Sequence, residues 1–374
     1  MKVQKISILA LPVMLAGCSA SKYVQEGEYI LNKVEVKSDS AAYDAGALKQ
    51  YVRQKEKPKL FSLFHNPFSK KPVVYDTLQA QLSCRDLLTA MQNQGFLHAG
   101  VTLQTEIHGQ EKTDSTAEKS RKKAPKVDVT YMLHPGEPFH IGKVEYDIED
   151  KNIEQILKLD EPENQKIKPG MRFTVDALDA ERKRIANRLL DDGYFRFNKD
   201  FIQFSADTIA GQKDIAVTLN LLKYKANSNA PETDHPRYEI RNISYQSNDS
   251  DRIHLRHRVL LNATALEEGK PYSASALQRT YNNFARLQAV KYTNIRFSEV
   301  AGNEIDSASV STSEIPSDST MNRLLDCHIQ ISTNKPSTIS FQPEGTNTAG
   351  DLGAAASLTY TNRNLFRGSE QLSI

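Results

Sequence analysis

Histidines and paired acidic residues are the side chains of this chain that could bind a metal ion or support catalysis. His254 and His257 lie three residues apart, a spacing that places two imidazoles on one face of a helix. Arg252, Arg256 and Arg258 surround them and would repel a cation. A surface helix therefore explains the pair without a metal.

The remaining candidates for chemistry have equally simple explanations. His134 and His140 bracket a Pro-Gly turn, and Asp191-Asp192 falls at a predicted helix end, where it would be solvated. The sequence lacks the Gly-x-Ser-x-Gly elbow of hydrolases, the phosphate-binding Gly-rich loop and His-Glu-x-x-His. We assign no catalytic residue, no metal ligand and no cofactor, and we expect the chain not to be an enzyme.

Cys18 is a predicted site of covalent modification. Residues 6–16 form an apolar run after two lysines, too short to span a bilayer as a mature helix and typical of a secretion signal. The run ends in Leu15-Ala16-Gly17-Cys18, which resembles the processing box of bacterial lipoproteins. The resemblance implies that residues 1–17 are removed, that acyl chains on Cys18 anchor the protein, and that residues 18–27 form a tether. An ordinary cleavage site with a chance cysteine is the alternative.

One apolar pattern occurs three times along the chain. Each copy has an apolar residue, two spacers, an apolar residue, one spacer and a third apolar residue. The copies are Leu31-Asn32-Lys33-Val34-Glu35-Val36, Ile141-Gly142-Lys143-Val144-Glu145-Tyr146 and Ile240-Arg241-Asn242-Ile243-Ser244-Tyr245. Their interval is longer than a solenoid repeat of roughly 20–50 residues and long enough for a small domain with its own core.

Two helices are predicted after each copy. The first is a weakly helical stretch, over residues 44–55, 152–159 and 253–261, and the second is a longer helix that opens after Tyr75, Phe173 or Tyr272. Two of the longer helices end at Gly95 and Gly193, as a left-handed C-terminal cap requires. The third is expected to end at Lys291-Tyr292.

Two strands then close each unit, and the last of them alternates between apolar and polar residues. Such alternation indicates a sheet that is wet on one face and covered by helices on the other. The order strand, helix, helix, strand, strand therefore occurs three times, and the fold class is α+β.

Together these marks resemble the POTRA domain, the periplasmic unit of the BamA and TamA superfamily of outer-membrane assembly proteins. The first strand, the helix that ends in Gly-Phe or Gly-Tyr, and Pro135-Gly136-Glu137-Pro138 before Ile141 carry the resemblance. Three copies favour the TamA-like branch, and the chain is most similar to the TamA-like lipoproteins of Bacteroidota. We expect domain 1 over residues 28–138, domain 2 over 139–224, a linker over 225–237 and domain 3 over 238–335.

The C-terminal segment, residues 336–374, has a different composition. It is rich in small and polar residues, and Asn364-Leu365-Phe366-Arg367-Gly368 falls at a turn between strand patterns. After three POTRA-like domains, the segment resembles the opening strands of the family's membrane β-barrel. Two strands cannot close a barrel, so we expect a fragment of a longer protein; the alternative is a truncated product that acts as a lipid-anchored docking scaffold.

Composition agrees with an exported binding protein. The chain has 48 basic and 46 acidic residues. It therefore lacks the excess of positive charge that would indicate binding to nucleic acid. Cys84 and Cys327 are expected to remain unpaired. Residues 108–126, 225–237 and 302–320 are expected to be loosely ordered. Lys57–Lys71, with Phe61 to Phe68 among lysines, would contact a membrane or, as we favour, pack on its own domain.

The resemblance implies a mechanism that depends on backbone groups. An extended client or partner would add a strand to the second strand of a domain, predicted over 99–107, 194–206 and 292–298. The expected contact residues are Val101, Thr102, Leu103, Gln104, Phe195, Phe197, Ile202, Phe204, Ile295 and Phe297.

The implied function is outer-membrane protein assembly or translocation, with unfolded outer-membrane proteins as clients and a TamB-like periplasm-spanning protein as a possible partner. The expected location is the outer membrane, with a lipid anchor and periplasmic domains. A docking scaffold without a barrel is the second hypothesis, and an envelope hydrolase is the third.

Overall fold

The computed structural model describes residues 24, 27–56, 72–109, 125–160, 162–208, 213–248, 252–300, 323–348 and 351–374. Several predictions lie outside these residues: those for the signal, Cys18, most of the tether and the Phe61–Phe68 patch. Most of residues 108–126 and all of residues 302–320 also lie outside them. The chain divides into two compact units. One holds Met1–Gly142 together with Pro169–Asp176 and Thr208–Ile215 of domain 2; the other holds Lys143–Lys168, Ala177–Asp207 and Ala216–Ile374.

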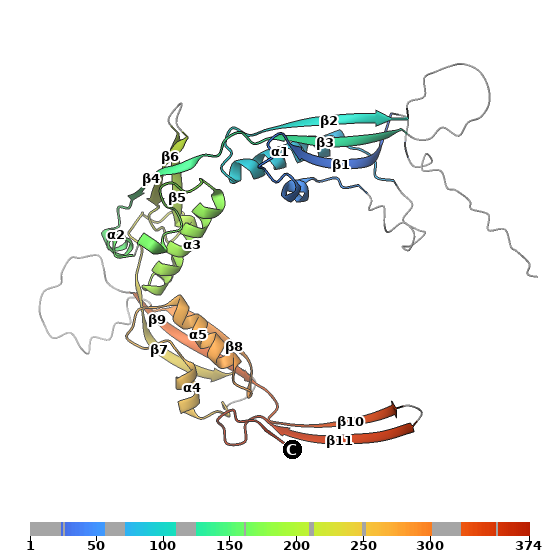
Figure 1. Cartoon of the computed structure of the whole chain (residues 1–374). Helices are drawn as coiled ribbons and strands as arrows, with labels where there is room; N and C mark the ends of the chain where they lie inside the picture. The colour runs from blue at the N-terminus through green and yellow to red at the C-terminus, as the bar shows by residue number, and fades with distance from the viewer. Residues whose placement is uncertain are drawn as a thin grey trace, which may run out of the picture. The chain divides into compact units, whose positions relative to one another are not determined.

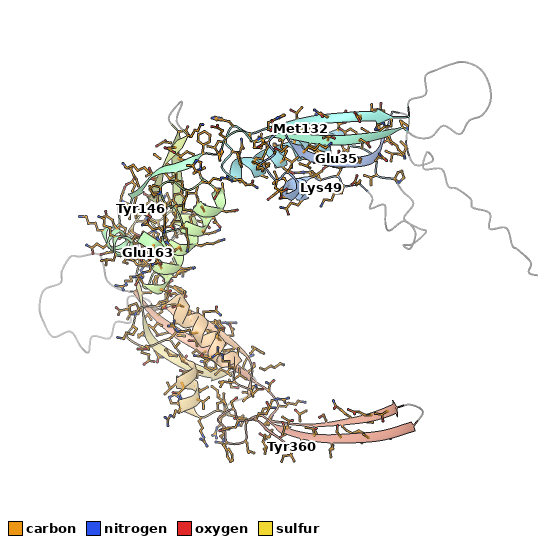
Figure 2. All side chains as sticks on the ribbon, viewed as in Figure 1. Glu35, Lys49, Met132, Tyr146, Glu163 and Tyr360 are labelled. Carbon is orange, nitrogen blue, oxygen red and sulfur yellow. The ribbon has the colours of Figure 1, made fainter. Side chains whose placement is uncertain are left out.

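Domain 1 is a three-stranded sheet with helices on one side (Figure 1). Its elements are β1 (Ile30–Ser38), the 3-10 helix η2 (Gly46–Tyr51), α1 (Thr77–Asn93), β2 (Gly100–His108) and β3 (Lys126–His134). The central strand β3 runs parallel to β1 and antiparallel to β2. The predicted order is confirmed, but the first helix of this domain is a short 3-10 helix. Figure 2 labels Glu35 on β1 and Lys49 on η2.

Domains 2 and 3 have the same order of elements. Domain 2 contains β4 (His140–Asp147), α2 (Lys151–Lys158), the 3-10 helix η4 (Pro162–Asn164), α3 (Val175–Asp191), the 3-10 helix η5 (Lys199–Phe201), β5 (Ile202–Thr208) and β6 (Asp214–Leu221). Domain 3 contains β7 (Tyr238–Ser247), α4 (His257–Ala263), α5 (Ala274–Ala285), β8 (Val290–Glu299) and β9 (Arg323–Thr333). In each sheet the last strand is central, in the orders β4-β6-β5 and β7-β9-β8.

Two predicted boundaries were wrong. Lys291 and Tyr292 lie in β8, because α5 already ends at Ala285. The second strand of domain 2 begins at Ile202 rather than Tyr194, because residues 194–201 form a turn and η5. In both places aromatic and apolar residues continue the hydrophobic pattern of the neighbouring element, although that helix or strand has ended or has not yet begun.

A fully buried polar side chain holds the helices of every domain together. It is the seventh residue of the long helix: Ser83, Glu181 or Thr280. Each accepts a hydrogen bond from a backbone N–H in the segment between the two helices, at 3.1 Å from Arg53, 2.7 Å from Lys166 and 3.0 Å from Ala265, respectively. A buried N–H without an acceptor would be destabilising, so this contact fixes where that segment returns to the helix.

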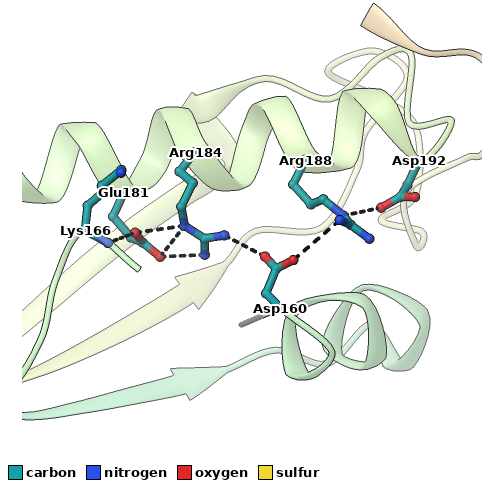
Figure 3. A network of polar contacts seen from close by, with 6 residues as sticks. All are labelled: Asp160, Lys166, Glu181, Arg184, Arg188 and Asp192. Carbon is teal, nitrogen blue, oxygen red and sulfur yellow. Dashed lines mark hydrogen bonds and ion pairs between the residues drawn. The ribbon is translucent and has the colours of Figure 1, made fainter. Parts of the chain in front are cut away.

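Glu181 belongs to a larger ion-pair network (Figure 3). The Arg184 guanidinium donates to Glu181 at 2.7 Å and to Asp160 at 2.5 Å. The Glu181 side chain is fully buried, and those of Asp160 and Arg184 are 7% and 14% exposed. Although burial alone lowers the pKa of Arg184, the hydrogen bonds to Glu181 and Asp160 raise it above its ordinary value. The network joins α3 to the segment that follows α2.

Domains 2 and 3 are each joined to the preceding domain by the same set of backbone hydrogen bonds, between the end of the preceding long helix and the start of the first strand; we call this the junction. The Gly95 carbonyl accepts from Phe139 N–H at 2.9 Å, and the Gly193 carbonyl accepts from Tyr238 N–H at 2.8 Å. The carbonyl of each aromatic residue then accepts from the aromatic residue before its own long helix, Phe173 at 2.9 Å or Tyr272 at 3.0 Å. The two glycines have φ of +94° and +102°, as the predicted left-handed caps require.

Residues 225–237 are more ordered than the sequence indicates. Tyr224 and Thr233 exchange two backbone hydrogen bonds, at 2.9 and 3.0 Å. His235 is buried against Phe197 and Phe201, with ring centroids 4.9 and 4.7 Å away. Aromatic packing therefore ties to domain 2 a segment whose proline and polar content predicts a loose linker.

Because His235 is buried, we expect the stability of domain 2 to depend on pH. Burial lowers its pKa below the ordinary value, and its Nε2–H donates to the Leu222 carbonyl at 2.8 Å. Below about pH 6.5 the unfolded chain takes up a proton that the folded domain resists, so stability falls as the pH decreases through this range. Urea unfolding from pH 8 to 5 should show a steeper loss for the natural chain than for His235→Gln, which keeps a donor without titrating. Equal slopes would contradict this assignment.

The C-terminal residues form a hairpin of β10 (Ser337–Thr348) and β11 (Asp351–Asn362), followed by the short β12 (Leu372–Ser373). Ile339 lies opposite Tyr360, and Phe341 lies opposite Leu358. These four side chains are 38–70% exposed. Between them come the polar pairs Thr338–Thr361, Ser340–Thr359 and Gln342–Ser357. Among the described residues, no helix is long and apolar enough to cross a membrane.

Candidate partner-binding edges

The second strand of every domain lies at the edge of its sheet, as predicted. In domain 1 the direction of its backbone groups follows from the neighbouring strands. The Leu133 carbonyl of β3 accepts from Asp39 N–H at 3.1 Å and therefore points toward β1. Its partner Val101 must then point its own N–H and C=O away from β3, because such groups alternate along an antiparallel pair.

The register between β2 and β3 is continuous, so this alternation extends along the strand. Val101, Leu103, Thr105 and Ile107 direct their backbone groups outward, while Thr102, Gln104 and Glu106 bond β3. Val101 and Leu103 also pack their half-buried side chains against the core. A partner strand would therefore find four outward donors and acceptors beside an apolar surface.

The opposite edge of domain 1 is closed. Leu31 N–H donates to the Val73 carbonyl at 2.8 Å, and Tyr75 N–H donates to the Tyr29 carbonyl at 2.8 Å. Farther along β1, the Glu56 carboxylate accepts from Val34 N–H at 2.9 Å. A returning segment and an acidic side chain thus occupy the positions that a partner strand would need.

Domain 3 closes its first strand in the same way. Ile240 N–H donates to the Lys270 carbonyl at 2.9 Å, and the Glu268 carboxylate accepts from Ile243 N–H at 2.7 Å. Val34 and Ile243 both follow a break in strand register, which turns an N–H outward. The two glutamates were not predicted; their shared position after a weak helix is a signal that a comparison of the repeats could have found.

The predicted contact residues are divided between two settings. Val101, Thr102, Leu103 and Gln104 lie on β2; Ile202 and Phe204 on β5; and Ile295 and Phe297 on β8. Phe195 and Phe197 are not on a strand. They lie in the turn before η5, so their placement on an edge strand was wrong.

Phe195 packs inside a cluster of aromatic rings. Its centroid is 5.6 Å from Tyr238, 5.0 Å from Tyr272 and 5.4 Å from Phe297. Phe197 is buried against His235. Both side chains therefore stabilise the fold at the junction between α3 and β7 instead of facing solvent.

The long helix provides further groups near the edges. In domain 3 the Tyr281 hydroxyl of α5 accepts from Ile295 N–H at 3.1 Å and contacts the Ile295 carbonyl at 3.5 Å. In domain 2 the Arg182 guanidinium lies 5.5 Å from the Phe204 ring centroid. Within the described residues, no cluster of three or more His, Cys, Asp or Glu side chains could hold a metal ion.

Comparisons with known proteins give likeness in structure only. Neither a protein-family model nor a curated protein matches the sequence. A crystal structure of Haemophilus influenzae BamA POTRA3-5 aligns at 12% identity with a TM-score of 0.38, covering 83% of this chain and 99% of that one.

Two longer structures align over smaller shares. BamA from Haemophilus ducreyi lacking POTRA domains 1-3 aligns at 15% identity with a TM-score of 0.39, over 63% of this chain and 36% of that one. CdiB from Acinetobacter baumannii aligns at 9% identity with a TM-score of 0.32, over 64% and 38%. The chain thus spans between a third and two fifths of these two proteins.

Proposed function

We propose that this chain is the periplasmic arm of a TamA-like outer-membrane assembly or translocation protein, which binds extended client segments by adding them to a sheet edge. The observation that carries the proposal is the outer edge of β2, with the outward backbone groups of Val101, Leu103, Thr105 and Ile107. Four such residues provide a ladder for a partner strand, and backbone hydrogen bonds select an extended conformation rather than a sequence.

The C-terminal hairpin supports the membrane half of the proposal. Its exposed apolar pairs alternate with polar pairs, which is the pattern of strands that face lipid on one side and a polar interior on the other. We propose that these strands open a barrel, and that acyl chains on Cys18 hold the domains at the outer membrane. The chain would thus bind its client without catalysing a reaction.

The test removes one outward donor from β2. Thr105→Pro deletes the outward N–H of Thr105 while leaving the bonds of Gln104 and Glu106 to β3 in place. With a photo-crosslinking residue at Gln104 in live cells, we expect outer-membrane β-barrel proteins to be captured, and Thr105→Pro to reduce this capture about tenfold. Mass spectrometry identifies the captured proteins.

Thr105→Ala is the matched control, because it removes the same side chain and keeps the N–H. It should capture clients at the natural level. If barrel proteins are not enriched, or if Thr105→Pro and Thr105→Ala behave alike, strand addition at β2 is not the function of this edge.

A further inference from the structure

The eighth residue of the long helix differs between the three domains. The buried hydrogen bond of the seventh residue aligns the helices independently of their ends, so the eighth residues, Cys84, Arg182 and Tyr281, occupy the same position. The position lies beside the second strand, since Tyr281 contacts β8 and Arg182 lies over Phe204 of β5. The side chain at this position therefore determines how the strand edge is covered.

In domain 3 this side chain occupies the edge. The Tyr281 hydroxyl accepts from Ile295 N–H at 3.1 Å and lies 3.5 Å from the carbonyl of the same residue. The Ile331 carbonyl accepts from Asn248 N–H and therefore points toward β7. Its partner Thr293 on β8 must then point its backbone groups away from β9. Ile295 lies two residues farther along β8 and points its N–H and C=O in the same outward direction. One hydroxyl thus takes the place of an incoming strand at the middle of β8.

Side chains also contact both ends of β8. At the start, the Val290 carbonyl accepts from the Asn334 side chain at 3.1 Å. Toward the end, Phe297 packs against Phe195 at 5.4 Å, and Glu299 accepts from Arg196 at 2.6 Å. A partner strand would meet these side-chain contacts in addition to the Tyr281 hydroxyl.

Domain 1 has no such closure at the equivalent place. Leu103 corresponds to Ile295, because Leu103 lies opposite Tyr131 and Ile295 opposite Ile329, the third inward residue of each central strand. Cys84 replaces the tyrosine, and its short side chain packs on the core of domain 1. In the part of the chain that the structure describes, no side chain hydrogen bonds to the backbone of Leu103.

We propose that β2 of domain 1 is the edge that receives the client strand, and that Tyr281 closes the edge of domain 3 against strand addition. The inference rests on the proposed function, since it names which domain performs the binding. The single residue after the buried polar position distinguishes an open edge from a closed one.

The surroundings of β2 also define the client segment. On the helix side, an added strand lies beside Val101 and Leu103, which are half-buried, and Ile107, which is 46% exposed. On the other side it lies beside Thr102, Gln104 and Glu106, which are exposed. No ion pair to Glu106 is found among the described residues. The matching occupant is an extended segment of alternating apolar and polar residues with a basic residue next to Glu106.

The test compares two equivalent positions in the purified full chain. Gln104 and Arg296 are both exposed and lie opposite Thr130 and His328, at the same place in the central strand. A photo-crosslinking residue is placed at one or the other. The probe is a synthetic nine-residue peptide that alternates valine with polar residues and carries one lysine; a peptide of the same composition plus a central proline is the control.

We expect the position-104 protein to capture the probe about tenfold more than the position-296 protein, and the proline peptide to be captured by neither. Tyr281→Phe removes only the hydroxyl, and should raise capture at position 296 severalfold without changing capture at position 104. Hydrogen exchange of the Ile295 amide should accelerate in the same variant, which reports the lost cap without any ligand.

The converse change closes the open edge. Cys84→Tyr should reduce capture at position 104 several-fold relative to Cys84→Phe, which differs by the hydroxyl alone, and slow exchange of β3 amides shows that each variant is folded. If either fails to fold, the Tyr281→Phe comparison decides the result. Equal capture at the two positions in the natural chain, or no effect of Tyr281→Phe on capture, would overturn the assignment of domains. Absence of capture at both positions would instead count against strand addition itself.

Discussion

Replacing Glu181 by alanine will destabilise domain 2 by about 3–5 kcal/mol, the usual cost of removing one partner from a buried ion pair. Glu181 is fully buried and accepts from both Arg184 and the Lys166 backbone. Alanine leaves a guanidinium that is 14% exposed with Asp160 as its remaining carboxylate partner in the network of Figure 3. The backbone N–H of Lys166 loses its acceptor as well.

Hydrogen exchange measured domain by domain is the suitable readout, because a chain of several domains does not unfold in one step. The amides of β6 should exchange faster in Glu181→Ala, while those of β3 and β9 stay unchanged. Arg188→Ala is the control on the same helix. Its side chain is 48% exposed, so its loss should cost less than about 1 kcal/mol.

A second control separates charge from packing. The double variant Glu181→Leu with Arg184→Met replaces the pair by apolar side chains and should recover part of the stability that Glu181→Ala loses. The Lys166 N–H stays without its acceptor, and Asp160 keeps Arg188 at 3.7 Å. If Glu181→Ala proves no more harmful than Arg188→Ala, the network has no structural role in domain 2.

The order of elements could be predicted because its signals are local. The three first strands, the alternating last strands and the glycines at two helix ends each reflect a preference that a few neighbouring residues determine. The aromatic residues Tyr75, Phe173 and Tyr272 were recognised as markers of the long helix. Their backbone groups in fact pair with residues that precede or begin the first strand, across a separation that sequence periodicity does not report.

The wrongly predicted strand residues are apolar side chains that pack against other segments of the chain instead of lying on a strand. Phe195 and Phe197 continue an apolar pattern into Ile202 and were read as one strand. Their rings instead pack between elements that are distant in sequence, Phe195 against Tyr272 and Phe197 against His235. A period-two pattern cannot distinguish a side chain that faces its own sheet from one that faces a neighbouring element.

The candidate site was predicted at the level of strands but not at the level of domains. That a second strand forms an edge follows from the repeat order, whereas the closure of β8 depends on a tyrosine fourteen residues earlier in the chain. The shared register of Ser83, Glu181 and Thr280 shows that Cys84 and Tyr281 are equivalent. The aromatic residues Tyr75, Phe173 and Tyr272, each eight residues before these three, mark the same register in the sequence, but they do not show which side chain reaches the strand edge.

The junction glycines give the second large effect. Gly95 has φ of +94°, and a Cβ there would collide with the backbone carbonyl of Phe173. Gly95→Ala therefore combines strain of about 1–2 kcal/mol from the left-handed backbone with separation of two backbone segments. The Phe139 N–H bond to Gly95 at 2.9 Å and the stacking of Arg172 over Phe96 at 5.1 Å should both be lost.

Gly193 and Gly170 also have a positive φ, so alanine at these positions separates the backbone strain from the steric clash. At Gly193 a Cβ would lie 2.9 Å from the flexible Arg237 side chain and 3.2 Å from the Tyr238 carbonyl, so part of the clash can relax. At Gly170 nothing lies within 4 Å of the added Cβ, which leaves backbone strain alone. Exchange of the Phe139 amide should therefore accelerate strongly in Gly95→Ala and remain near its natural rate in Gly170→Ala, with the Tyr238 amide in Gly193→Ala in between. A ranking with Gly170→Ala as the most harmful variant would mean that strain, and not close approach of the two backbones, explains the glycine at each junction.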